Sequence, residues 1–241
     1  MPTDVLPPSE SALAARARQA LAAVPCFANL PPHVQEAIVR VAAPRHYDAG
    51  QVIYLEGEPA TAVFILEAGW VKATRMSPDG REQAMLFLKP PEVFGDVAVF
   101  TATPYPGTVM ALEPVDAWAI DRSAILDLVA RHNELAMAVI RHLARRVLYY
   151  VGLVEDLSLR TVEARLAHTL LQHAQQSEGR WVVPRRAWTT FGEMATRLGT
   201  VRDVLSRAFR TLEQEGLLRV ERHEIIICDP QGMAARGDRY D

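Results

Sequence analysis

The chain has 241 residues, of which 49% are hydrophobic, enough for two domains that each have a core. Its net charge is −3, and its two cysteines, Cys26 and Cys228, are too few for an iron–sulfur cluster, which usually takes four. No apolar run approaches the roughly 18 residues that a membrane span needs, and residues 1–10 lack a secretory pattern, so we expect a cytoplasmic protein.

The first half of the chain is expected to contain two helices followed by many short strands. Residues 11–24 are rich in alanine, and residues 31–41 form a second short helix behind two prolines. Between residues 44 and 121 the pattern changes to short β-branched and apolar runs separated by turn residues, including the hairpin signal Asp79-Gly80. Closely spaced antiparallel strands with glycine and proline turns indicate a β-roll or barrel.

After Arg122 the pattern changes to long helices. Mostly large side chains recur at spacings of three and four residues for about three heptads. The positions are Leu135, Val139, His142, Leu143, Arg146, Tyr150, Leu153, Val154 and Leu157. We favour a seam between two helices of a dimer, with burial inside one chain as the alternative. A hinge is expected at residues 156–161, before an amphipathic helix over residues 162–175.

The last third of the chain has the order of elements of a winged helix-turn-helix. Thr190 and Glu193 are spaced as a capping box for a short helix over residues 191–198. A turn at Gly199 and Thr200 leads to a second helix over residues 201–215, which stops at Gly216. Two short apolar runs around residues 221–223 indicate a wing hairpin.

The second helix of this motif has a predicted buried face and a predicted polar face. The buried face consists of Val204, Leu205, Ala208, Phe209 and Leu212. Arg202, Asp203, Ser206 and Arg207 are expected to reach base edges in the major groove, where the fork of Arg207 matches guanine. Arg210, Thr189, Thr190 and Arg222 are expected at phosphates. Residues 185–222 carry eight arginines and five acidic residues, a modest local excess of +3.

Four stretches occur in a characteristic order: GEPATAVFILEAGWVK, FGDVAVFTATPYPGT, a long helix with ARRV, and LGTVRDVLSRAFRTLEQEGLL. Together they resemble the CRP/FNR family of bacterial transcription regulators. The resemblance implies an α+β fold: a cyclic-nucleotide-binding-type antiparallel β-roll (residues 1–130), a dimerisation helix (131–157) and a winged helix-turn-helix (158–241). It also implies a homodimer on a palindromic operator in double-stranded DNA, contact with RNA polymerase, and control by an effector or by redox state.

The residues that hold cyclic AMP in this family are changed here. The resemblance implies a Gly-Glu-Leu loop for the ribose and a Pro-Arg-Ser or Pro-Arg-Ala loop for the phosphate, but this chain has Gly95-Asp96-Val97 and Pro104-Tyr105-Pro106. A buried phosphate without a cation would be costly. The adenine-reading Thr-Ser pair falls on Tyr150 and Val151. The effector-pocket candidates are Gly95, Asp96, Tyr105, Thr108 and Tyr150, and the expected effector is not cyclic AMP, or there is none.

Several alternatives stay open at this point. A haem-dependent gas or redox sensor of the same fold could use His142 or Cys26, although an interface histidine and an inert buried thiol are the simpler interpretations. No metal site and no catalytic motif is predicted, so an enzyme with an appended DNA module has no support. The polar face of Arg202, Ser206 and Arg207 argues against a module that has kept this fold but lost DNA binding. We expect Arg207 to read the guanine of a TTG- or GTGA-like half-site.

Overall fold

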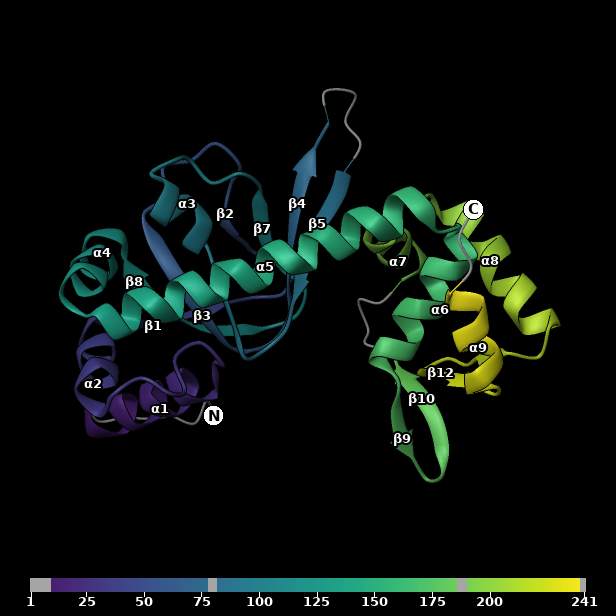
Figure 1. Cartoon of the computed structure of the whole chain (residues 1–241), viewed down its shortest axis with the longest axis horizontal. Helices are drawn as coiled ribbons and strands as arrows, with labels where there is room; N and C mark the ends of the chain where they lie inside the picture. The colour runs from purple at the N-terminus through teal and green to yellow at the C-terminus, as the bar shows by residue number, and fades with distance from the viewer. Residues whose placement is uncertain (1–9, 78–81, 186–189, 239–241) are drawn as a thin grey trace, which may run out of the picture. The chain divides into compact units, whose positions relative to one another are not determined.

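The computed structural model describes residues 10–77, 82–185 and 190–238 (Figure 1). The chain divides into two compact units, one of residues 1–75 and 85–146 and the other of residues 76–84 and 147–241. The boundary falls after Arg146, inside the long helix α5 (Asn133–Leu159). The predicted Asp79-Gly80 turn lies outside the described residues. Among the described helices, none combines the length and the apolar character required to cross a bilayer.

The first unit contains the predicted antiparallel β-roll. Helices α1 (Glu10–Ala23) and α2 (Pro32–Val41) precede the strands β1 (Ala42–Tyr47), β2 (Val52–Tyr54), β3 (Ala62–Ala68), β4 (Val71–Met76), β5 (Glu82–Leu88), β6 (Glu92–Phe94), β7 (Thr108–Ala111) and β8 (Val115–Asp121). The strands form two four-stranded sheets, in the orders β1-β8-β3-β6 and β2-β7-β4-β5. The described pairings are antiparallel, which confirms the predicted fold class.

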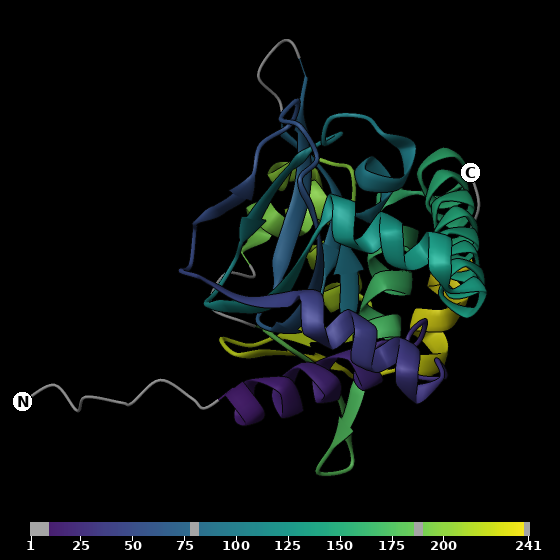
Figure 2. The ribbon, with the colours of Figure 1, turned by 90° about the vertical axis from the view of Figure 1, so that its left-hand side faces the viewer.

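Two further helices complete the first unit: α3 (Asp96–Thr101) between β6 and β7, and α4 (Arg122–Arg131) after β8. Helix α3 was not predicted because its six residues are too few to show helical periodicity. Figure 2 shows α1 and α2 along the lower side of the roll. Side chains from α1, α2, α4 and the start of α5 share one core with β3 and β8, and fully buried Leu21, Ile38, Ile120 and Ile125 are part of it.

The second unit contains the predicted winged helix-turn-helix. Its elements are α6 (Val162–His173), β9 (Gln175–Ser177), β10 (Arg180–Pro184), α7 (Phe191–Arg197), α8 (Arg202–Gln214), β11 (Leu218–Val220), β12 (Glu224–Ile227) and α9 (Pro230–Gly237). The wing strands β11 and β12 belong to an antiparallel sheet of order β11-β12-β10-β9. The hairpin of β9 and β10 and helix α9 were not predicted. Strand β9 is short, polar and exposed, so it lacks the alternation that marks a strand.

The first residues of the predicted dimer seam on α5 pack against the core of the first unit instead of facing a second copy of the chain. Leu135 is fully buried in the core of the first unit, and Val139 packs against that core. The first part of the predicted seam is therefore internal to the chain, as in the alternative interpretation. Exposed apolar residues at alternating spacings of three and four define instead an exposed stripe, which consists of Met137, Ile140, Ala144, Val147, Val151 and Val154.

Candidate nucleic-acid interface and effector region

The turn between α7 and α8 has the local structure that its sequence predicts. Thr190 caps α7, since its Oγ1 accepts a hydrogen bond of 3.2 Å from the backbone N of Glu193. Gly199 has a φ of +62°, a conformation that favours glycine, and the N of Thr200 donates to the carbonyl of Ala195 at 3.0 Å. The turn therefore sets the direction in which α8 begins.

Helix α8 is held in place by its apolar face. Leu205, Ala208, Phe209 and Leu212 are buried in the core of the second unit, as predicted. The ring of Phe209 meets that of Phe191 edge-on, with centroids 5.1 Å apart, and so joins α8 to α7. A helix anchored in this way presents its opposite face in a fixed orientation.

The opposite face of α8 carries charges that are not neutralised within the unit. Arg202, Asp203 and Arg207 are exposed, and no ion pair of Arg202 or Arg207 occurs in the described parts of the chain. Arg210 is exposed as well, and its Nε donates to the backbone carbonyl of Ser206 at 3.3 Å. Two guanidinium groups on the first turns of this helix are thus open to an external acceptor.

The wing places a further arginine at its tip. Arg222 is exposed between β11 and β12, and within the described residues it has no ion-pair partner. Arg219, by contrast, pairs with Glu221 at 2.8 Å. Arg185, the residue directly after β10, supports the wing by donating from Nη1 to the carbonyl of Glu221 at 3.0 Å. From the sequence, Arg185 was included only in the net charge of residues 185–222. Its contact with the wing could not be predicted, because it joins residues that are far apart in the chain. Thr189, another predicted phosphate contact, lies outside the described residues.

In the first unit, Tyr105 is part of the roll's packing. It is 3% exposed and stacks on Tyr54, with ring centroids 3.7 Å apart. Its hydroxyl donates to the carbonyl of Ala62 at 2.9 Å and accepts from the backbone N of Ala62 at 3.2 Å. Gly95 lies close by, since a Cβ there would stand 3.5 Å from the Tyr105 ring and 2.9 Å from the Ala62 carbonyl. The side chain at the position of the family's phosphate arginine is buried and fully hydrogen-bonded.

Asp96 is bound by two residues of α5. It is 2% exposed, Nη1 of Arg146 lies 2.5 Å from its Oδ1, and Nε2 of His142 lies 3.3 Å from its Oδ2. Burial alone would raise the pKa of Asp96, but the nearby imidazole and guanidinium outweigh that effect and hold this pKa below its ordinary value. The carboxylate that sequence analysis assigned to an effector is therefore engaged within the chain.

The remaining candidates have varied surroundings. Thr108 accepts a hydrogen bond from the backbone N of Glu56 at 3.1 Å. Tyr150 belongs to the second unit, where its ring meets Tyr149 edge-on, with centroids 5.7 Å apart. His142, predicted on a seam, faces Asp96 instead. Cys26 is buried, and burial raises the pKa of its thiol to about 12, so the thiol stays protonated.

Comparison with known proteins agrees with this architecture. The cyclic nucleotide-binding domain family matches residues 44–132, and the Crp-like helix-turn-helix domain family matches residues 164–236. A CRP-like cAMP-activated global transcriptional regulator of Mycobacterium tuberculosis is 29% identical over 90% of this chain and 97% of its own length. The transcriptional activator protein anr of Pseudomonas aeruginosa is 26% identical over 75% of this chain and 74% of its own length.

Among solved structures, FixK2 from Bradyrhizobium japonicum covers 83% of this chain and 98% of its own, with a TM-score of 0.73 at 21% identity, which supports the fold alone. A β-roll of the cyclic-nucleotide-binding type followed by a Crp-like helix-turn-helix defines a class of DNA-binding transcription regulators. The chain belongs to the CRP/FNR family of that class.

Proposed function

We propose that this regulator binds a palindromic operator as a homodimer and reads it with Arg202, Asp203, Ser206 and Arg207. The observation that carries the proposal is the pair of exposed arginines, Arg202 and Arg207, on a helix whose other face is fixed in a core. The first residues of a recognition helix meet base edges, and a guanidinium can bond to both N7 and O6 of guanine. Arg210, Arg222 and the two threonines before α7 are assigned to phosphates.

The exposed stripe on α5 supports the homodimer. Its residues follow the heptad spacing of a two-helix coiled coil, and Ile140, Val147 and Val154 are 57%, 60% and 62% exposed in the single chain. Burying apolar side chains at such positions against a second copy of the chain stabilises a dimer. Twofold symmetry would then place two recognition helices about 34 Å apart, one turn of DNA.

The effector, if one exists, is proposed to be something other than cyclic AMP. The relative from Mycobacterium tuberculosis is described as cAMP-activated, but Tyr105 and Asp96 support a different assignment here. Tyr105 brings no cation for a cyclic phosphate and fills space with its stacked ring. Asp96 is occupied by Arg146 and His142. Contact with RNA polymerase and a cytoplasmic location are part of the proposal by family resemblance.

The test is an unbiased selection of binding sites from random duplex DNA with the full chain, with and without cyclic AMP. The expected result is a twofold-symmetric consensus with a guanine in each half-site, unchanged by the nucleotide. An asymmetric or guanine-free consensus would contradict the assignment of Arg207. Sedimentation of the same preparation checks the dimer, and a monomer at the concentration that binds DNA would contradict the twofold arrangement.

A further inference from the structure

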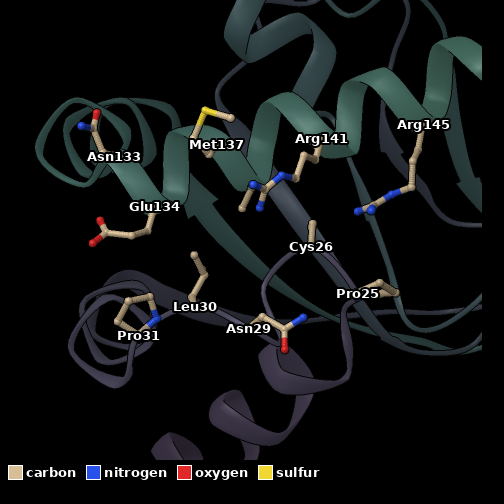
Figure 3. A pocket seen from close by; sticks show the side chains of 11 residues that line it. Pro25, Cys26, Asn29, Leu30, Pro31, Asn133, Glu134, Met137, Arg141 and Arg145 are labelled. Carbon is tan, nitrogen blue, oxygen red and sulfur yellow. The ribbon is translucent and has the colours of Figure 1, made fainter.

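A pocket of about 540 Å³ lies in the first unit, between the segment that joins α1 to α2 and the first half of α5 (Figure 3). The joining segment contributes Cys26, Asn29 and Leu30 to its wall, and α5 contributes Met137 and Ala138. Pockets that bind small molecules have volumes of roughly 300–1000 Å³ and combine apolar walls with a few polar groups. This pocket has that size, its wall mixes apolar residues with several polar and charged ones, and it is separate from the Tyr105 region inside the roll.

The polar groups of the pocket include two cations. Arg141 and Arg145 stand one turn apart on α5, and Figure 3 shows both side chains leaving the helix on the side of Cys26. Neither has an ion-pair partner in the described residues, and Glu134, which also lines the pocket, points away from them. Like charges at this spacing repel each other. An anion between the two guanidinium groups would remove that repulsion.

A second copy of the chain would not supply the anion. In a parallel two-helix seam along the exposed stripe, Arg141 occupies a flanking position. The positions that flank the stripe on its other side are Ala136, Leu143 and Tyr150, and none of them is acidic. The buried thiol of Cys26 stays protonated and adds no negative charge. The two cations therefore remain available in the proposed dimer.

We propose that this pocket binds a small organic carboxylate with an apolar body, of the medium-chain fatty-acid class. The guanidinium groups of Arg141 and Arg145 hold the carboxylate, because planar forks of N–H donors match its two oxygens. The apolar body lies along Leu30, Met137 and Ala138. Because Met137 is also the first residue of the exposed stripe, an occupant would touch the dimer seam. The site deepens the proposed function by naming an effector class, and only its regulatory consequence rests on that function.

The experiment is isothermal titration calorimetry of the full chain with octanoate as the probe. Octanamide, which has the same body without charge, and acetate, which has the charge without the body, serve as matched ligands. We expect octanoate to bind at one site per chain and both matched ligands to bind at least about tenfold more weakly. The double variant R141Q/R145Q should lower octanoate affinity by about tenfold to a hundredfold, since charge-assisted hydrogen bonds are lost.

The control is R131Q, which removes an exposed arginine that lies on α4, outside the pocket lining, and pairs with Asp127. It should bind octanoate as the wild type does, and circular dichroism should show that both variants are folded. The proposal is overturned if octanoate does not bind, if octanamide or acetate binds equally well, or if R141Q/R145Q binds like R131Q. Operator binding by the same preparations keeps the two proposals apart. If the protein binds its operator but not octanoate, only the proposal of a carboxylate pocket is rejected. If it binds octanoate but no operator, only the proposed operator binding is rejected.

Discussion

Arg146 in the first unit and the two arginines at the start of α8 in the second unit are used in opposite ways. In the first unit, Arg146 forms an ion pair with Asp96, whose carboxylate is 2% exposed. In the second unit, Arg202 and Arg207 are exposed, and no described residue forms an ion pair with either. A paired and desolvated charge stabilises the fold but has little left for a ligand, whereas an open guanidinium can replace the counterions of DNA. Arg202 and Arg207 of α8 are thus open for contact, while the carboxylate of Asp96 is engaged by side chains of its own chain.

The largest effect expected from this comparison is on stability, at Asp96. Replacing it with asparagine removes one charge of a buried pair and leaves Arg146 without its partner. Breaking such a pair costs about 3–5 kcal/mol when it is fully buried, and Arg146 retains some contact with solvent, so we expect D96N to lose about 2–4 kcal/mol. Chemical denaturation, which gives the free energy of unfolding of the first unit, measures this loss. D127N, on the exposed α4 pair, is the control and should be nearly neutral.

The ion pair of Asp96 and Arg146 also predicts how the stability of the protein changes at acidic pH. Because the native-state pKa of Asp96 is lowered, its contribution to stability is complete above the ordinary carboxyl pKa of about 4 and is lost as the pH falls through the lower native value. The difference in unfolding free energy between the wild type and D96N should therefore shrink below about pH 4. A difference that stays constant from neutral to strongly acidic pH would show that the charge of Asp96 does not stabilise the fold.

A smaller effect, on DNA affinity and specificity, is expected at Arg207. R207A should cost about 1–3 kcal/mol of binding free energy and relax one base position in each half-site, because a bidentate contact to guanine is lost. R222A should weaken binding to all sequences alike and reduce the salt dependence, since a phosphate contact carries no base identity. Electrophoretic titrations on the selected operator and on each of its single-base variants distinguish the two. If the two variants show the same pattern, the assignment of base and phosphate contacts is wrong.

Local patterns explain why the second unit was largely predictable. The buried residues of α8 recur with helical periodicity, and Gly199 and Gly216 mark the turn and the helix end, with φ of +62° and +72°. The partners of Asp96 could not be predicted, because His142 and Arg146 are about fifty residues away in the chain. The predicted seam was wrong in its first part, at Leu135 and Val139, for a related reason. Helix α5 has two apolar faces, and sequence spacing does not tell which of them packs on the chain's own roll.

The smallest effect is expected at Thr190, whose side chain accepts a hydrogen bond that caps α7. T190A removes the acceptor for the backbone N of Glu193 and should destabilise the second unit by about 1 kcal/mol. T190S keeps an acceptor of the same kind and should restore the stability. If Thr190 also contacts a phosphate, as proposed, then T190A should weaken binding to all operators equally, beyond the effect of its lower stability. Comparing thermal unfolding with DNA affinity for both variants separates the cap from the phosphate contact.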